Sequence, residues 1–174
     1  RSTVMNSLCD FINQNRRAIS EEDLGGVSEL FSGHQAVWED GAIQLVHNPQ
    51  RRGAGKIYTP YDVTDFMCTS IAKNLVNQVE NPDQLFELNV LDPAVGSGAF
   101  CAQFVRKVWK CAKRKWKLKD EQKFRIQVCQ NMIHACDIDA EALQLAQVVM
   151  WVTSGCPDSN IRLNFVLTAS LDAG

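Results

Sequence analysis

The sequence lacks the features that mark several specialised classes of protein. Its seven cysteines are odd in number and include no Cys-x-x-Cys pair, and its three histidines are scattered, so neither a disulfide framework nor a zinc site is expected. No apolar run approaches the roughly 18 residues of a membrane span, and no signal peptide is visible. The net charge of −2 means that the chain as a whole is not a polycation that would seek nucleic acid. These absences predict a cytoplasmic protein with reduced cysteines, without a metal and without membrane contact.

The composition that remains is that of an ordinary folded domain. The 174 residues are 45% hydrophobic and 22% charged, and a chain of this length buries roughly 70% of its unfolded surface. Because it begins at Arg1 rather than Met, we expect a processed or truncated chain. Apolar residues at helical spacing predict that residues 1–54 form a helical arm without a sheet, while residues 55–174 form a second domain.

One stretch, residues 90–100, organises the second domain. A short apolar run before Asp92 predicts a buried parallel strand that ends there. Pro93 has no N–H to continue the strand ladder. Gly96 and Gly98 permit a sharp turn and a close approach of the backbone to a ligand. An apolar pattern of helical period follows, and strand, glycine turn and helix together place a small ligand at the carboxyl end of a sheet.

The glycine turn alone does not identify the ligand. Cys101 stands where the dinucleotide fingerprint has its third glycine, and a purely structural turn stays open at this point. A second apolar strand ends before Asp137, whose carboxylate could accept hydrogen bonds from both hydroxyls of a ribose. Asp137 lies 39 residues after Gly98, against roughly 20 in the dinucleotide pattern, which weakens an NAD interpretation. Residues 121–130 predict a further helix. Asp139 is placed to cap the helix after the second strand, and Gly155 and Pro157 are placed to end it. Residues 163–167 predict a third strand.

The helix before the glycine turn has clear start signals. Thr59 is a natural N-cap, and Pro60 suits the first helical position. The apolar residues that follow recur at a spacing of four and are predicted to form the core face of a well-capped helix; they are Val63, Met67, Ile71 and Leu75.

The helix after the glycine turn becomes strongly basic. Eight of the 18 Lys and Arg residues lie within residues 106–119, with Trp109 and Trp116 interleaved. Basic and aromatic residues combine in this way in nucleic-acid grooves. The helix runs away from the ligand edge of the sheet, however, so a solvated face or a partner contact is favoured.

Three motifs, taken together, resemble a known family. Tyr-Thr-Pro at residues 58–60, Asp-Pro-Ala-x-Gly-Ser-Gly-Ala-Phe at 92–100 and Asp-Ile-Asp-x-x-Ala at 137–142 resemble the S-adenosylmethionine-binding half of N6-adenine DNA methyltransferases of restriction-modification and related defence systems. The segment order is that of the gamma type, and the resemblance covers about residues 55–172. It implies an α/β fold with a Rossmann-like class I methyltransferase sheet, partial in this chain, and S-adenosylmethionine as the cofactor.

The resemblance also implies roles for individual residues. Tyr58, Thr59 and Pro60 would line the methionine end of the cofactor. The turn would hold its amino-acid part, Asp137 would bind the ribose hydroxyls, and apolar side chains would contact the adenine. The implied cofactor-binding set is Tyr58, Thr59, Pro60, Asp92, Ala94, Gly96, Gly98, Asp137, Ile138 and Leu171.

The sequence departs from the family in two places. Ala169 stands where an acid that binds the adenine amino group is expected, and this lowers the expected cofactor affinity. The catalytic segment, Asn-Pro-Pro followed by Tyr or Phe, does not occur; residues 48–50 and 81–83 match only its first two positions. We therefore expect a chain without catalytic residues of its own, inactive alone.

The leading hypothesis is the cofactor-binding part of a site-specific DNA adenine-N6 methyltransferase. Its expected partners are double-stranded DNA and specificity or restriction subunits. Two alternatives remain: an RNA or protein-amide methyltransferase of the same fold, and a non-enzymatic, degenerate cofactor domain that binds a partner or DNA through the basic helix.

Overall fold

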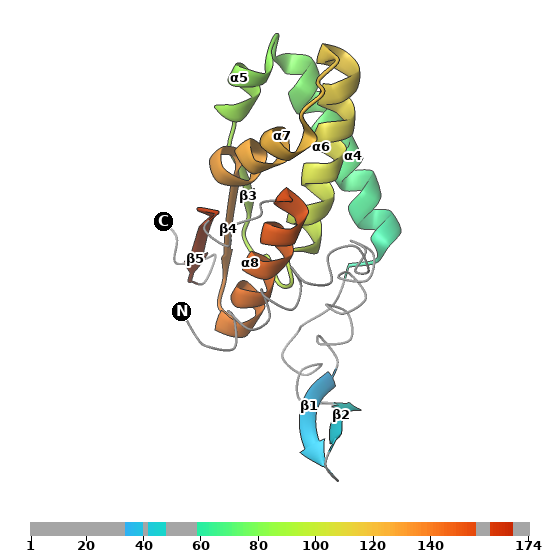
Figure 1. Cartoon of the computed structure of the whole chain (residues 1–174), viewed down its shortest axis with the longest axis vertical. Coiled ribbons are helices and arrows are strands. Elements are labelled where there is room, and N and C mark those ends of the chain that lie inside the picture. Colours follow the sequence, from blue (N-terminus) through green and yellow to red (C-terminus); the bar gives the residue numbers. More distant parts are fainter. Residues whose placement is uncertain (1–33, 40–41, 48–58, 156–160, 169–174) are drawn as a thin grey trace.

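The computed structural model describes residues 34–39, 42–47, 59–155 and 161–168. Figure 1 shows the arrangement of the elements. They are β1 (His34–Glu39), β2 (Ala42–His47), α4 (Tyr61–Gln78), α5 (Pro82–Phe86), β3 (Val90–Asp92), α6 (Ala99–Trp116), α7 (Glu121–Gln127), the π-helical turn η1 (Val128–Met132), β4 (Ile133–Asp137), α8 (Ala140–Ser154) and β5 (Asn164–Leu167).

The last three strands form a parallel sheet in the order β3-β4-β5. Asp92 at the end of β3 pairs with Ala135, while Asp137 at the end of β4 pairs with Leu167. The central strand therefore extends two residues beyond β3, and its carboxyl end overhangs the turn that follows β3. The three strands and their parallel order confirm the coarse prediction of an α/β fold, with strand boundaries shifted by one or two residues.

Helices α6 and α8 connect the strands and cover one face of this sheet (Figure 1). The core between these layers contains Val105, Val108 and Ala146, all fully buried. Leu91 and Val166 lie on the opposite face, because their partners His134 and Cys136 are two residues apart on β4. They are 65% and 57% exposed, so within the described residues only one face of the sheet is covered.

The buried face of α4 differs from the prediction. The residues that pack inward are Thr64, Cys68, Ala72 and Val76, whereas the predicted core residues Val63, Met67 and Ile71 are 45%, 43% and 41% exposed. The inward residues are small, so α4 lies close to α6, and the Cys68 thiol donates to the carbonyl of Phe100 at 3.5 Å. The close packing of α4 on α6 therefore determines which side of α4 is buried, rather than the spacing of its larger apolar side chains.

The predicted cap of α4 is also wrong by one residue. The helix begins at Tyr61, and Pro60 rather than Thr59 occupies the N-cap position, with no side-chain hydrogen bond. The Pro60 carbonyl accepts hydrogen bonds from the N–H groups of Val63 and Thr64, both at 3.1 Å. The Thr64 hydroxyl donates to the same carbonyl at 3.3 Å, so the first turn is closed mainly by backbone groups, with one side chain from inside the helix.

Two further predictions need correction. The expected arm without a sheet contains an antiparallel pair, since β1 and β2 pair from His34–His47 to Glu39–Ala42. The helix predicted over residues 121–130 ends at Gln127 and continues as the turn η1. The division into domains at residue 54 stays a prediction. Among the described helices, none combines the length and apolarity that crossing a bilayer would require.

Candidate functional site

The turn between β3 and α6 is held by backbone geometry that needs glycine. Gly96 and Gly98 have φ values of 52° and 85°, in the left-handed region. Gly98 is the N-cap of α6, and a Cβ placed on it would lie 3.1 Å from Ala146 Cα on α8. A Cβ on Gly96, in contrast, would meet no atom within 4 Å. Gly98 therefore serves helix packing, while Gly96 borders open space at the edge of the sheet.

Asp137 ties this turn to the central strand. Its Oδ2 accepts a hydrogen bond from the Gly96 N–H at 2.8 Å, and its Oδ1 accepts one from the Asp139 N–H at 2.9 Å. A carboxylate oxygen has two acceptor positions, so each oxygen keeps capacity for one further donor. Sequence reasoning assigned Asp137 to a ligand and missed this bracing role. The local hydrogen bond to the Asp139 N–H could have been predicted, because Asp side chains often accept from the N–H two residues on in an Asx-turn. The bond from Gly96 leaves no such local signal in the sequence.

Asp92 lies at the start of the same turn. One of its oxygens accepts from the Ala94 N–H at 3.2 Å, and the other accepts from the Cys101 thiol at 3.8 Å. Burial is the main cause that raises the pKa of Asp92 above its usual value, and the charge of Asp137 acts in the same direction. The Ala94 and Cys101 hydrogen bonds oppose this shift. A cation bound beside Asp92 would offset both the desolvation and the repulsion between the carboxylates.

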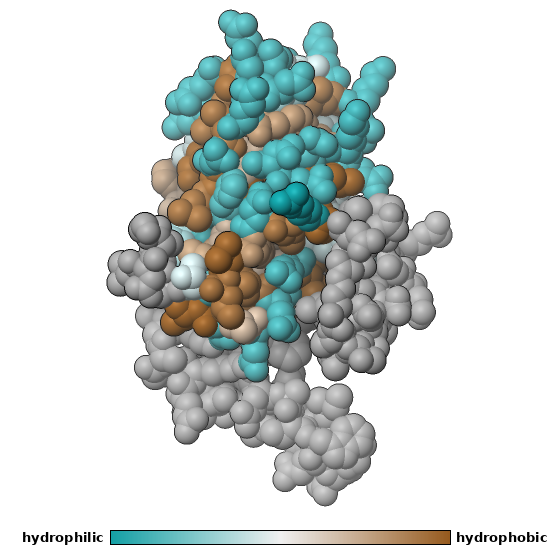
Figure 2. All heavy atoms as spheres, turned by 90° about the vertical axis from the view of Figure 1, so that its left-hand side faces the viewer, coloured by the Kyte–Doolittle hydropathy of each residue, from teal (hydrophilic) through white to brown (hydrophobic). Residues whose placement is uncertain are grey.

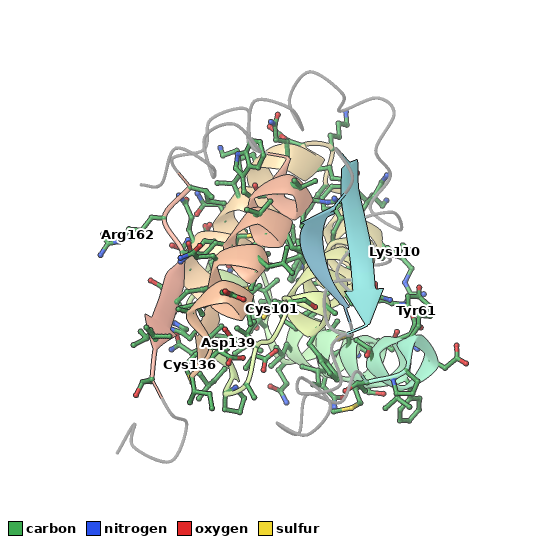
Figure 3. All side chains as sticks on the ribbon, turned by 90° about the horizontal axis from the view of Figure 1, so that it is seen from below. Tyr61, Cys101, Lys110, Cys136, Asp139 and Arg162 are labelled. Carbon is green, nitrogen blue, oxygen red and sulfur yellow. The ribbon has the colours of Figure 1, made fainter. Side chains whose placement is uncertain are left out.

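The cysteines near the turn are structural. Cys101, in the place of a third glycine, is 5% exposed, and burial raises the pKa of its thiol well above the usual value. Cys136 donates from its thiol to the Pro93 carbonyl at 3.3 Å. Figure 3 labels Cys101, Cys136 and Asp139 in the view from below. A protonated, buried thiol such as that of Cys101 is a poor nucleophile, so this group supports packing and hydrogen bonding rather than chemistry.

Apolar side chains border the acidic edge. Ile138 is 75% exposed directly after Asp137, and Leu167, the β5 partner of Asp137, is 56% exposed. Figure 2 shows hydrophobic atoms gathered toward the lower part of the face on the β5 side. Exposed aliphatic groups beside carboxylates suit a ligand that combines a flat apolar ring with hydroxyl or ammonium groups.

The structure thus brings together six of the ten residues that the sequence predicts for the site. These six are Asp92, Ala94, Gly96, Gly98, Asp137 and Ile138. Thr59 and Pro60 precede α4, and in the described residues no hydrogen bond joins them to the acidic edge. Tyr58 and Leu171, with the departure at Ala169, lie outside the described residues.

A shallow hollow of about 510 Å³ lies elsewhere, along the outer side of α4. Tyr61, Asp65 and Lys73 are among its lining residues. This hollow is open and shares no residue with the glycine turn. We therefore assign the candidate site from the carboxylates and glycines of the turn, and not from this hollow. In the part of the chain that the structure describes, no group of three or more His, Cys, Asp or Glu side chains could hold a metal.

A glycine turn after the first strand of a parallel sheet, with an acid at the end of the second strand, is an arrangement at which α/β domains bind nucleotide-like ligands. The model of the N-6 DNA methylase family matches residues 42–164, and the chain belongs to this family. A type II restriction enzyme and methyltransferase of Methanocaldococcus jannaschii is 31% identical over 154 residues, which cover 63% of this chain and 13% of that protein. The chain thus matches only about an eighth of the length of this curated relative. No solved structure matches significantly.

Proposed function

We propose that this chain binds S-adenosylmethionine at the carboxyl edge of β3 and β4. The observation that carries the proposal is the placement of two carboxylates, Asp92 and Asp137, on either side of a glycine turn that borders open space. The cofactor has an amino-acid end with an ammonium group, and a ribose with two hydroxyls. These are the groups that a desolvated carboxylate and a carboxylate with spare acceptor positions would bind.

Each residue at the edge has a distinct role in this proposal. Asp92 attracts the ammonium group of the cofactor, and the free space at Gly96 lets its amino-acid part approach the backbone. Asp137 accepts the ribose hydroxyls while it continues to hold the turn. Ile138 lies against the adenine ring. By resemblance, Tyr58, Thr59 and Pro60 line the methionine end, and Leu171 touches the adenine.

We further propose that the whole protein methylates the N6 amino group of adenine in double-stranded DNA within a restriction-modification system, together with specificity or restriction subunits. The family match and the restriction enzyme among the relatives support this assignment. The bound cofactor supplies an electrophilic methyl group, and rate enhancement comes from its alignment with the amino nitrogen. The target base has to leave the DNA stack to reach it.

The residues in hand supply only the cofactor side of that alignment. The Asn-Pro-Pro segment that holds the flipped adenine in related enzymes does not occur in these 174 residues. We therefore expect this chain to bind S-adenosylmethionine without methylating DNA by itself. Methyl transfer from labelled cofactor to adenine-containing DNA by this chain alone would contradict that expectation.

Calorimetric titration with S-adenosylmethionine tests the proposal. We expect saturable binding to the wild-type chain, no binding of NAD, and at least tenfold weaker binding to the Asp137→Asn variant, because the amide presents a donor where two acceptors are needed. Asp120→Asn is the matched control: Asp120 is the exposed N-cap of α7, and Asn caps a helix equally well. Equal affinities of the Asp137 and Asp120 variants, or failure of a folded wild-type chain to bind, would refute the site.

A further inference from the structure

The positive charge of the chain is concentrated in one segment. Residues 106–123 contain nine of the 18 Lys and Arg residues but only two of the 20 Asp and Glu residues, which gives this segment a charge of +7. The remaining residues then carry −9, since the whole chain has a net charge of −2. The net charge of the chain is therefore small although residues 106–123 are strongly basic. Such a separation of charge favours contact with a polyanion through this segment alone.

Four of these cations form a stripe along the outer side of α6, three within the helix and Lys117 at its C-cap. Lys110, Lys113, Arg114 and Lys117 follow the i, i+3, i+4, i+7 spacing that places residues on one side of a helix, and all four are exposed. The buried side of α6 contains other positions, among them Val108. Among the described residues, none of the four has an ion-pair partner in the structure, although Lys113 lies 5.5 Å from the ring centre of Trp109 within the same helix. We call these four residues the basic stripe.

Other cations of the same segment are already engaged. Lys107 forms an ion pair with Asp65 at 2.6 Å. Lys115 donates to the carbonyls of Val76 and Val79, at 2.8 and 2.6 Å, at the end of α4. These contacts join α4 to α6, so Lys107 and Lys115 have a structural role in the packing of the two helices. The basic stripe has no comparable internal role, and this separates it from the structural cations.

Of the two tryptophans of the segment, Trp109 is buried, and Trp116 is half-buried and hydrogen-bonded. Trp109 is 4% exposed and packs on Phe124, with ring centres 5.4 Å apart. Trp116 donates its indole N–H to the Glu80 carbonyl at 2.8 Å. Bases therefore cannot stack on Trp109, and the mode of binding that single-stranded nucleic acids use with interleaved aromatics is excluded for it. The stripe offers charge alone, which suits the phosphates of a duplex and reads no sequence.

The basic stripe lies far from the cofactor edge. At a rise of 1.5 Å per residue, Lys110 and Lys117 are roughly 18 and 28 Å along the axis from Gly98. Figure 1 shows α6 running from the glycine turn at the lower end to the upper end of the molecule, and Figure 2 shows hydrophilic side chains gathered over that upper end.

We propose that the basic stripe is a second, sequence-independent contact with double-stranded DNA, made through phosphates at a distance from the base that is methylated. The choice of a duplex rather than an acidic protein rests on the proposed function, since a DNA methylase acts on this polyanion. The contact holds the enzyme on DNA without selecting the sequence, and it acts independently of cofactor binding.

The test measures binding of the full 174-residue chain to a fluorescent 40-base-pair duplex by anisotropy, over a range of salt concentrations. The test variant is Lys110→Glu with Arg114→Glu. The control variant is Lys73→Glu with Arg162→Glu, which changes the net charge by the same amount at exposed residues. Figure 3 shows Lys110 and Arg162 pointing outward on opposite sides of the molecule.

We expect the test variant to bind roughly tenfold more weakly, and to lower the slope of log affinity against log salt by about two, since each phosphate contact contributes about 0.9. The control variant should bind within about twofold of the wild-type chain, and the loss should be the same on duplexes of unrelated sequence. Equal losses in both variants, or no duplex binding by the wild-type chain at low salt, would overturn the proposal. So would unchanged DNA binding accompanied by lost self-association in sedimentation, which would assign the stripe to an acidic protein surface.

A titration with S-adenosylmethionine on the same variants separates the two proposals. Both variants should bind the cofactor like the wild-type chain, because none of the four substituted residues lies at the acidic edge. A wild-type chain that binds duplex DNA through the stripe but binds no cofactor would refute the proposed cofactor site and leave the stripe as a DNA contact.

Discussion

The two glycines of the turn offer a sharp test of how the site is built, because they have similar backbone angles but different surroundings. An alanine at Gly98 would adopt φ near 85° and place its Cβ 3.1 Å from Ala146 Cα and 3.2 Å from Ala146 Cβ. A left-handed conformation costs about 1–2 kcal/mol, and a side chain forced into a packed interior costs about 1–3 kcal/mol. Because one of the opposing atoms is backbone, rotation of a side chain cannot relieve the clash. We expect Gly98→Ala to lower the free energy of unfolding by about 2–5 kcal/mol.

Gly96→Ala is the matched control. Its φ is 52° and its Cβ would meet no atom within 4 Å, so only the backbone term applies. Part of that term is offset by the reduced entropy of the unfolded chain, which leaves a loss of about 0.5–1 kcal/mol. The same methyl group would occupy the space that the proposal gives to the cofactor. Gly96→Ala should therefore weaken S-adenosylmethionine binding strongly while the fold is nearly unchanged.

Urea denaturation followed by tryptophan fluorescence measures the first effect, and calorimetric titration measures the second. The diagnostic result is that Gly98→Ala loses more stability, whereas Gly96→Ala loses cofactor binding although its fold is nearly unchanged. Equal destabilisation by both substitutions would show that contact between the turn and α8 is not tight. Normal cofactor binding by Gly96→Ala would show that the open space at this residue is not where the ligand lies.

Further predictions concern titratable groups and one helix end. Burial and the Asp137 charge raise the pKa of Asp92 in the folded chain, so ionised Asp92 lowers the free energy of unfolding at pH values above that pKa. Asp92→Asn should therefore unfold at a higher urea concentration than the wild-type chain at pH 7, and this advantage should be lost as the pH falls through the folded pKa toward the lower pKa of the unfolded chain. The same variant should bind S-adenosylmethionine at least tenfold more weakly. Burial raises the pKa of Cys68 to about 11, so its thiol is protonated at pH 8. Iodoacetamide at pH 8 should therefore label this residue only after unfolding, as read by peptide mass spectrometry. Rapid labelling of the native chain would contradict this prediction. The Lys115 ammonium donates to two carbonyls at the end of α4. Lys115→Met should therefore lower the free energy of unfolding by about 1 kcal/mol in urea titrations. An unchanged urea midpoint would show that this cap is dispensable.

Local rules were sufficient for the turn and its flanking elements. Pro93 and the two glycines determine where β3 ends and α6 begins, since one lacks an N–H and the others accept positive φ. Asp139 caps α8 with its side chain, and Gly155 ends it at φ 71°, both as predicted. Each of these features depends on the conformational preferences of a few adjacent residues, which the sequence states directly.

The sequence by itself therefore determined the order of strand, turn and helix, and which residues stand at the ends of the strands. Tertiary structure alone decided which side of α4 is buried, that Trp109 turns inward while Lys110 and Lys113 face solvent, and that Asp137 holds Gly96 from 41 residues away. The physical reason is that backbone preferences act between near neighbours in the chain. The choice among side-chain faces, and the partner of a carboxylate, depend on which distant element packs close enough to exclude water.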